Sequence, residues 1–283
     1  MPMSGAQSAP AATAGGPAWP QLTAPPSWRV VDLISDLHLD AGEPETFLAW
    51  QHYMQHTPAQ AVFILGDLFE VWVGDDVITK PASGAPGSDN FEDRCAQVLR
   101  QGAARRDVYF MRGNRDFLVG DTFTRACGVH LLQDPTMLGF AGRRWLLSHG
   151  DALCLDDTDY MRFRALVRSA AWQQEFLGQP IQQRKAVARG LRERSEARKR
   201  SHPVLVDVDA QAAVRWLRMA RADTLIHGHT HRPADHDLGG NLRRIVLSDW
   251  DLRASPPRAQ VLRIAAGAAT GPAVVQRMAI GTY

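Results

Sequence analysis

Cysteine is scarce in this sequence and follows no recognisable spacing. The 283 residues include three cysteines, Cys95, Cys127 and Cys154, with no C-x-x-C pair. An odd, unpatterned set predicts neither a disulfide framework nor a thiolate zinc site. It is typical of a protein from a reducing compartment such as the cytoplasm.

Long apolar runs and an excess of one charge are also missing. No run approaches the ~18 residues of a membrane-spanning helix, so we do not expect an integral membrane protein. Lys and Arg number 32 against 30 Asp and Glu, and the net charge of +2 is too small for a general nucleic-acid binder. Hydrophobic residues make up 45% of the chain, which excludes a disordered, fibrous or small disulfide-rich protein.

The amino-terminal segment, residues 1–27, has a composition of its own. It lacks Lys, Arg and a continuous apolar core, so it does not predict a signal peptide. Six of the 17 prolines fall in it. Because such a segment buries little apolar surface, we expect a flexible extension, with a docking tail as the alternative. The remainder, 28–283, is predicted to be one domain.

Short apolar runs alternate with helical periodicity from residue 29 onward. Helices are predicted at about 44–56, 90–105 and 209–221. Alternation of this kind favours α/β layers on a largely parallel sheet, with the last strands (near 244–248, 261–264 and 273–278) antiparallel. Ahead of the strand near 273–278, strands are predicted at 30–35, 61–65, 108–111, 144–148, 224–227, 244–248 and 261–264.

A segment at about 152–205 has almost no strand pattern and predicts a two-helix insertion, with its second helix at about 181–200. Eight basic residues crowd 184–202 against Glu193 and Glu196. A charge run of this kind is usually a solvated helix face. An insertion between strands also suits a lid, and concentrated positive charge suits an anionic substrate or lipid headgroups.

Polar residues follow five of the predicted strands directly. In open α/β folds ligands bind at the carboxyl ends of strands, so the five loops are expected to converge. Two pairs of these residues, Asp36 with His38 and His229 with His231, are spaced two positions apart. On an extended segment, both side chains of such a pair would point the same way. The donors gathered in this way are Asp36, His38, Asp67, Asn114, His149, His229 and His231.

This donor set predicts a metal centre. Each piece alone is more often a helix cap or a turn, but five in order at strand ends are not explained by turns. Carboxylate, amide and imidazole donors without thiolate suit Mn²⁺, Fe or Zn²⁺. Seven donors exceed one tetrahedral ion and fit two ions sharing a carboxylate, a recurring device for phosphate-ester hydrolysis.

The order D-x-H, G-D, G-N-R-D, H-G and G-H-x-H, from Asp36 to His231, resembles the calcineurin-like metallophosphoesterase family. The resemblance implies an α/β fold in which two mixed β-sheets are flanked by helices (α-β-β-α), here with a helical lid insertion. It implies two divalent ions, with Asp67 bridging and His227 structural. One ion would be held by Asp36, His38, Asp67 and His231, and the other by Asp67, Asn114, His149 and His229.

Arg115 stands where many members of this family have His. Protonating an alkoxide leaving group needs an acid that titrates near neutrality, which a guanidinium is not. A phosphate can leave without protonation, so Arg115 favours cleavage of a pyrophosphate over an alkyl monoester. Its planar fork can also hold phosphate oxygens. The alternative is a structural Arg115 paired with Asp116.

Longer stretches, including GDLFEVWVGDD (66–76) and HGHTHRP (227–233), are similar to the branch of this family that hydrolyses UDP-2,3-diacylglucosamine in lipid A biosynthesis. That resemblance implies water attack at the α-phosphorus, giving UMP and 2,3-diacylglucosamine 1-phosphate (lipid X). It further implies Mn²⁺ and a peripheral position on the cytoplasmic face of the inner membrane. No nucleic acid and no obligate protein partner are expected. The runner-up is a dinuclear phosphodiesterase acting on a soluble nucleotide.

The resemblance also implies particular site residues. The catalytic set is Asn114, Arg115 and His149, and the predicted substrate contacts are Asn114, Arg115, Asp157, Ser195, Lys199, His202 and His229. Leu155, Lys199 and His202 depart from the residues usual in that branch, which have Thr, Asn and Lys there. From proximity in sequence, we further expect Asp116, Asp151 and Asp251 to orient ligand imidazoles.

Overall fold

The computed structural model of this protein describes residues 19–78, 90–201, 207–267 and 271–280, without the side chains of 193–201. Its strands form two six-stranded sheets. The first has the order β1 (Gln21–Thr23), β6 (Thr136–Phe140), β7 (Arg143–Leu147), β8 (Thr224–His227), β10 (Leu242–Val246) and β9 (Ala234–Gly239). The second has the order β12 (Val274–Ala279), β11 (Gln260–Ala265), β2 (Val30–Ile34), β3 (Ala61–Leu65), β4 (Asp107–Met111) and β5 (His130–Leu132).

Both sheets are mixed. Strands β2, β3, β4 and β5 run parallel, and β11 is antiparallel to both β2 and β12. In the other sheet β7, β8 and β10 run parallel, while β6 and β9 are antiparallel to their neighbours β7 and β10. The parallel strands therefore bring their carboxyl ends to one edge of the sandwich.

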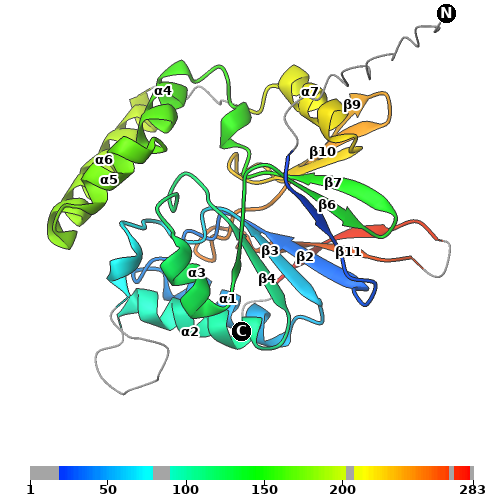
Figure 1. Ribbon diagram of the computed structural model, residues 1–283, viewed down its shortest axis with the longest axis horizontal. Coiled ribbons are helices and arrows are strands. Elements are labelled where there is room, and N and C mark those ends of the chain that lie inside the picture. The colour runs from blue at the N-terminus through cyan, green and yellow to red at the C-terminus, as the bar shows by residue number, and fades with distance from the viewer. Residues whose placement is uncertain (1–18, 79–89, 202–206, 268–270, 281–283) are drawn as a thin grey trace, which may run out of the picture.

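Alternation along the strands builds the layers. Phe63 and Leu65 of β3 pack between the sheets with residues such as Trp145, whereas Val62 and Ile64 face the opposite way and belong to the cluster that includes α1 and α2 side chains. Helices α1 (Pro44–His56), α2 (Phe91–Ala103) and α3 (Asp121–Cys127) lie on that outer face, and α7 (Ala210–Ala220) lies on the other sheet (Figure 1). The predicted α-β-β-α sandwich is confirmed.

The insertion contains three helices where two were predicted. They are α4 (Thr158–Val167), α5 (Ala170–Leu177) and α6 (Ile181–Ser201), and they project from one end of the sandwich (Figure 1). The side chain of Ser169 accepts a hydrogen bond from the Trp172 N–H and starts α5, which explains the extra break. Within the described part of the chain, no helix is long and apolar enough to cross a membrane.

Two further expectations are wrong. The flexible extension predicted over 1–27 does not hold for Gln21–Thr23, which form β1 and pair in parallel with β6. Trp19 also packs against Trp216 of α7, with ring centroids 5.2 Å apart, while residues 1–18 lie outside the described ranges. The strand predicted at 244–248 is parallel to β8 and in the sheet opposite β11, so it is not part of an antiparallel run with it.

Candidate active site

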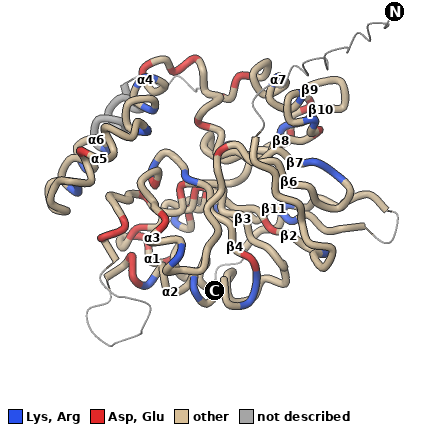
Figure 2. Tube along the Cα trace, viewed as in Figure 1, with Lys and Arg blue, Asp and Glu red and all other residues tan. Residues whose placement is uncertain are grey.

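The predicted ligands lie directly after the ends of five strands. Asp36 and His38 follow β2, Asp67 follows β3, and Asn114 follows β4. From the other sheet, His149 follows β7, and His229 and His231 follow β8. Several Asp and Glu positions lie in the loops between the sheets and α4–α6 (Figure 2). The site thus forms where both sheets end, beside the insertion.

The backbone at the site is strained. Eight non-glycine residues among those described have a positive φ, and five of these are predicted ligands: Asp36, His38, Asp67, His229 and His231. The backbone at Asp36 and His38, and at His229 and His231, is therefore in the left-handed region. The expectation that these two pairs lie on extended segments is wrong. Such conformations cost on the order of 1–3 kcal/mol each and persist where the surroundings impose them.

The glycines of the motifs are required by close approach. A Cβ on Gly113 would collide with the carboxylate of Asp67, and a Cβ on Gly228 would collide with Asp36. The motif glycines therefore allow the loops to approach the two carboxylates, which no other residue would permit.

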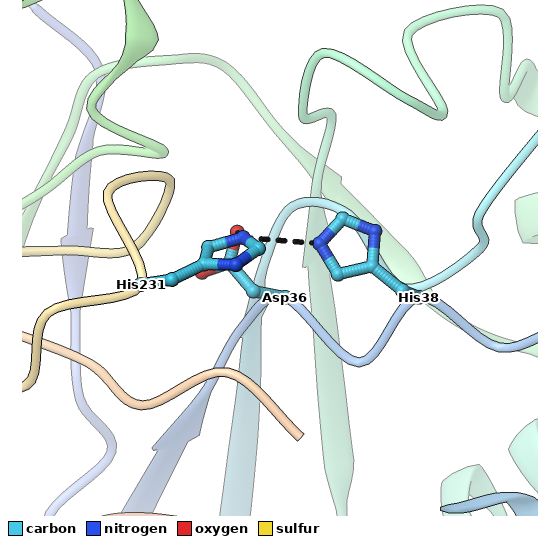
Figure 3. A group of neighbouring side chains, drawn as sticks. All are labelled: Asp36, His38 and His231. Atoms are coloured by element: carbon cyan, nitrogen blue, oxygen red, sulfur yellow. Dashed lines mark hydrogen bonds and ion pairs between the residues drawn. The ribbon is translucent and has the colours of Figure 1, made fainter. Parts of the chain in front are cut away.

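One group of donors comprises Asp36, His38 and His231, whose side chains converge in Figure 3. Nε2 of His231 lies 3.3 Å from Asp36 Oδ1 and 3.1 Å from Nε2 of His38. Asp36 is fully buried, and His231 is exposed to 36% of its side-chain surface. The group therefore opens to solvent on the His231 side.

Asp67 lies between this group and a second one. Its Oδ2 is 4.0 Å from His38 Nε2 and 3.7 Å from His149 Nε2. The second group of possible ligands contains Asp36, Asp67 and His149. Asn114 Oδ1 completes it, at 2.9 Å from His149 Nε2 and 2.8 Å from His229 Nδ1. All seven predicted donors are thus brought together, with Asp67 in the central position expected of a bridging ligand.

The tautomers of two histidines are set for cation binding. His38 Nδ1 lies 2.7 Å from Glu70 Oε2, and His149 Nδ1 lies 2.9 Å from the Leu65 carbonyl oxygen. Because each Nδ1 faces an acceptor, Nε2 is the ring nitrogen directed into the site. Nε2 of His149 lies beside the Asn114 oxygen, so these two atoms are placed to hold one cation together.

The electrostatics point the same way. Burial alone would raise the pKa of Asp36, but the hydrogen bond from His231 and the nearby histidines hold it well below its usual range. Burial lowers the pKa of His149, yet the carboxylates of Asp67, Asp36 and Asp151 outweigh it and raise that pKa to about 9. The site therefore attracts positive charge, which fits divalent ions.

The side chain of Arg115 faces Glu70 and does not pair with Asp116. Its backbone N–H donates to Asp67 Oδ1 at 2.8 Å, and its guanidinium lies 3.6 Å from Glu70. Asp116 instead accepts backbone N–H groups, those of Leu68 and Gly113 both at 2.8 Å. The structural pair of Arg115 with Asp116 is not formed, and Asp116 fixes the loop that carries Asp67.

Asp151 and Asp251 form their hydrogen bonds with residues other than the ligand imidazoles. Asp151 Oδ2 accepts from Tyr160 Oη at 2.7 Å and from Arg164 Nε at 2.8 Å, so it holds α4 against the site. Asp251 accepts from Arg258 at 3.1 Å. None of the described hydrogen bonds of Asp116, Asp151 and Asp251 reaches a ligand imidazole, and Asp151 acts on His149 only through its charge, which raises the His149 pKa.

The predicted substrate contacts are only partly within the described structure. Asn114, Arg115 and His229 lie at the centre. Asp157 caps α4 by accepting the Tyr160 N–H at 3.0 Å, and the Tyr160 ring stacks on His229 with centroids 5.8 Å apart. The side chains of Ser195 and Lys199, and His202 altogether, lie outside the described residues.

Sequence reasoning missed Glu70, which contacts His38 and faces Arg115. It follows Asp67 by three residues in GDLFE, and no spacing rule marks it. It also missed Asp249, held by Arg258 and lying 3.8 Å from His231 Nδ1. Glu70 follows a ligand-bearing strand closely, whereas Asp249 follows β10, which carries none of the predicted ligands.

Comparison with known proteins defines the class. Residues 30–233 match the calcineurin-like phosphoesterase family, and the chain belongs to that family. Among curated proteins, the UDP-2,3-diacylglucosamine hydrolase of Stenotrophomonas maltophilia is 42% identical over 247 residues, covering 83% of this chain and 94% of that protein.

Two further proteins of the same name give similar values. That of Aromatoleum aromaticum is 45% identical, covering 77% of this chain and 87% of its own. That of Pseudomonas aeruginosa is 43% identical, covering 77% and 90%. Among solved structures, wild-type Vps29 from Entamoeba histolytica aligns with a TM-score of 0.42 at 14% identity, covering 89% of this chain and 99% of that one.

Proposed function

We propose that this protein is a two-metal hydrolase that cleaves the pyrophosphate bond of UDP-2,3-diacylglucosamine. Water attacks the α-phosphorus, and the products are UMP and 2,3-diacylglucosamine 1-phosphate. The observation that carries the proposal is the convergence of two carboxylates, one amide oxygen and four imidazoles at the ends of both sheets. Relatives named UDP-2,3-diacylglucosamine hydrolase, matched over 94% and 87% of their own length, support this substrate.

The metal ligands divide around Asp67. Asp36, His38 and His231 would hold one ion with Asp67, and Asn114, His149 and His229 would hold the other with it. When bound, two divalent ions neutralise phosphate charge and lower the pKa of a coordinated water molecule. The oxygen and nitrogen donors suit Mn²⁺, which we propose as the physiological ion.

Arg115 supplies the selectivity for a phosphate leaving group. Its backbone N–H donates to Asp67, and its guanidinium lies 3.6 Å from Glu70, which contacts His38. There it can bind phosphate oxygens and stabilise the charge that grows on them in the transition state. Because it cannot act as a proton donor, a leaving group that needs no proton is favoured.

The insertion would bind the acyl chains. Of its apolar residues, Val167 and Phe176 are buried, and Phe176 stacks on Trp172 of the same helix. Leu166 and Leu177 remain 56% and 42% exposed. Exposed apolar side chains beside a phosphate site suit a lipid-linked substrate taken from a membrane surface. We therefore place the protein peripherally on the cytoplasmic face of the inner membrane.

The deciding experiment is incubation with UDP-2,3-diacylglucosamine and Mn²⁺ in ¹⁸O water. Label in UMP is the expected result, because the α-phosphorus is attacked. Label in the sugar phosphate would move the attack to the β-phosphorus. Absence of products, with hydrolysis of a soluble nucleotide diester under the same conditions, would favour the second candidate, a phosphodiesterase for soluble nucleotides.

A further inference from the structure

Glu70 connects three parts of the molecule that carry different tasks. Its side chain is 10% exposed and lies in the loop after β3. Oε2 lies 2.7 Å from His38 Nδ1. Oε1 lies 3.0 Å from Arg192 Nε of α6 and 3.6 Å from Arg115 NH1. One carboxylate thus touches a proposed metal ligand, the proposed phosphate-binding arginine and the insertion.

The close contact of Glu70 with His38 Nδ1 favours Nε2 as the nitrogen that binds a metal ion. A carboxylate at Nδ1 keeps the proton there, fixes the ring plane and makes Nε2 a stronger donor. Asp36 is on the other side of the ring: its Oδ1 lies 3.3 Å from His231 Nε2, the atom that His38 Nε2 approaches to 3.1 Å. Without Glu70, the His38 ring loses its only acceptor at Nδ1 among the described contacts. It would then be free to rotate or to exchange tautomers.

The arginines hold the Glu70 carboxylate in place. Oε1 lies 3.0 Å from Arg192 Nε and 3.6 Å from Arg115 NH1. Because the Oε1 atom faces both guanidiniums, Arg192 neutralises charge that Arg115 would otherwise have to balance alone. Arg115 is then available for a phosphate.

A second arginine of α6, Arg184, also binds the loop after β3. Arg184 is buried and donates to the Asp76 carboxylate and to the Val73 carbonyl oxygen, the latter at 2.5 Å. Arg184 and Arg192 are eight residues apart, about 12 Å along a helix. Within residues 181–192, the described part of α6, Arg184 and Arg192 each contact the loop after β3, and Arg192 does so at the carboxylate that contacts His38.

We propose that Glu70 is a positioning residue that presents His38 Nε2 to a divalent ion, and that Arg192 links metal occupancy to the position of α6. The inference rests on the proposed function in one respect, namely that His38 is a metal ligand. It assigns to Glu70 and Arg192 roles in metal binding and in coupling to the insertion.

The first test is Mn²⁺ binding by titration calorimetry to the wild type, Glu70→Met and Glu70→Gln. Met keeps the volume but not the acceptor, and we expect affinity at one of the two ions to fall about 10–100-fold. Gln keeps an acceptor for His38 and should bind closer to the wild type. Circular dichroism verifies folding, and Glu70→Ala repeats the comparison without the bulk of Met.

The outcomes separate the two claims. A wild type that binds no Mn²⁺ would overturn the proposed function. A wild type that binds two ions, with Glu70→Met binding them equally well, would overturn the role of Glu70 alone.

The second test measures the link to α6 by hydrogen exchange with and without Mn²⁺. In the wild type, Mn²⁺ should slow amide exchange in residues 181–192. Arg192→Met should lose this response, whereas the control Asp76→Asn should keep it, because it weakens the other anchor of α6. An unchanged response in Arg192→Met would refute the link.

Discussion

At the scale of single residues, Asp67 is the residue that contacts both groups of proposed metal ligands. It is 2% exposed, lies between the two groups of imidazoles, and also accepts the Arg115 N–H. A buried carboxylate in that position is stable only beside positive charge. Its removal should therefore affect the chemistry more than the fold, since Asp116 continues to hold the loop.

Asp67→Ala should leave a folded protein whose turnover is reduced by ~10²-fold or more, as expected when a central electrostatic group is lost. The measurement is hydrolysis at saturating Mn²⁺, with circular dichroism for folding. Asp223→Asn is the matched control, because it removes a surface carboxylate paired with Arg143. Full turnover in Asp67→Ala would contradict the bridging role.

Arg115→Lys should keep the charge and lose the planar fork, so pyrophosphate cleavage should fall about 10-fold or more without a change in melting temperature. Arg143→Lys is the control, since its pair with Asp223 is on the surface. Equal activity of Arg115→Lys and the wild type would mean that position 115 acts through charge alone.

The ligands were predictable from sequence because each follows its strand within a few residues. Asp36, Asp67 and His149 needed only the strand ends and the rule that carboxyl ends converge. The left-handed backbone was not predictable, since the loops impose it through contacts between distant segments. Glu70 was missed for the same reason: its partner Arg192 is 122 positions further along the chain.

At the scale of elements, helical periodicity predicted the longer helices. The helix predicted at about 44–56 is α1, with Pro44 in its first turn. Short elements were missed, among them α3 and the edge strand β9, whose sequence ADHDLG alternates without a strong apolar face. Their structure comes from pairing with neighbours, which a local pattern does not contain.

One ion pair fastens the segment before α7 to β10. Arg244 is buried and donates to Asp207 Oδ1 and Oδ2 at 2.7 and 3.0 Å. The Arg244 hydrogen bonds, against the opposing effect of partial burial, lower the pKa of Asp207 to about 2. A carboxyl with a lowered pKa stabilises the fold above its usual pKa near 3.8 and loses that contribution as pH falls through 2.

Asp207→Asn should therefore lower the melting temperature at pH 6 and make little difference near pH 2. The effect is small in size, because the Asp207 side chain is 39% exposed and solvent screens the pair. Calorimetry at both pH values measures it, with Asp235→Asn, whose Arg277 pair is more exposed, for comparison. An equal loss at both pH values would show that the ion pair is not its cause.

At the scale of the whole molecule, the sandwich positions the metal ligands and the insertion contacts the residues around them. The sheets bring seven donors together, while Arg164 of α4 binds Asp151 and Arg192 of α6 binds Glu70. The same insertion exposes Leu166 and Leu177 to solvent. A soluble nucleotide substrate would have no use for those side chains, whereas acyl chains would bury them.

The double variant Leu166→Ser, Leu177→Ser tests this division. Burying a Leu side chain contributes about 1.5–3 kcal/mol, so KM for UDP-2,3-diacylglucosamine should rise about 10-fold or more while kcat changes little. Hydrolysis of a small phosphodiester should be unaffected, because the metal ligands are untouched. Val274→Ser, 47% exposed on β12, is the control for loss of surface apolarity. If both substrates lost activity equally, the two leucines would serve the fold of the insertion and the acyl chains would have to bind elsewhere.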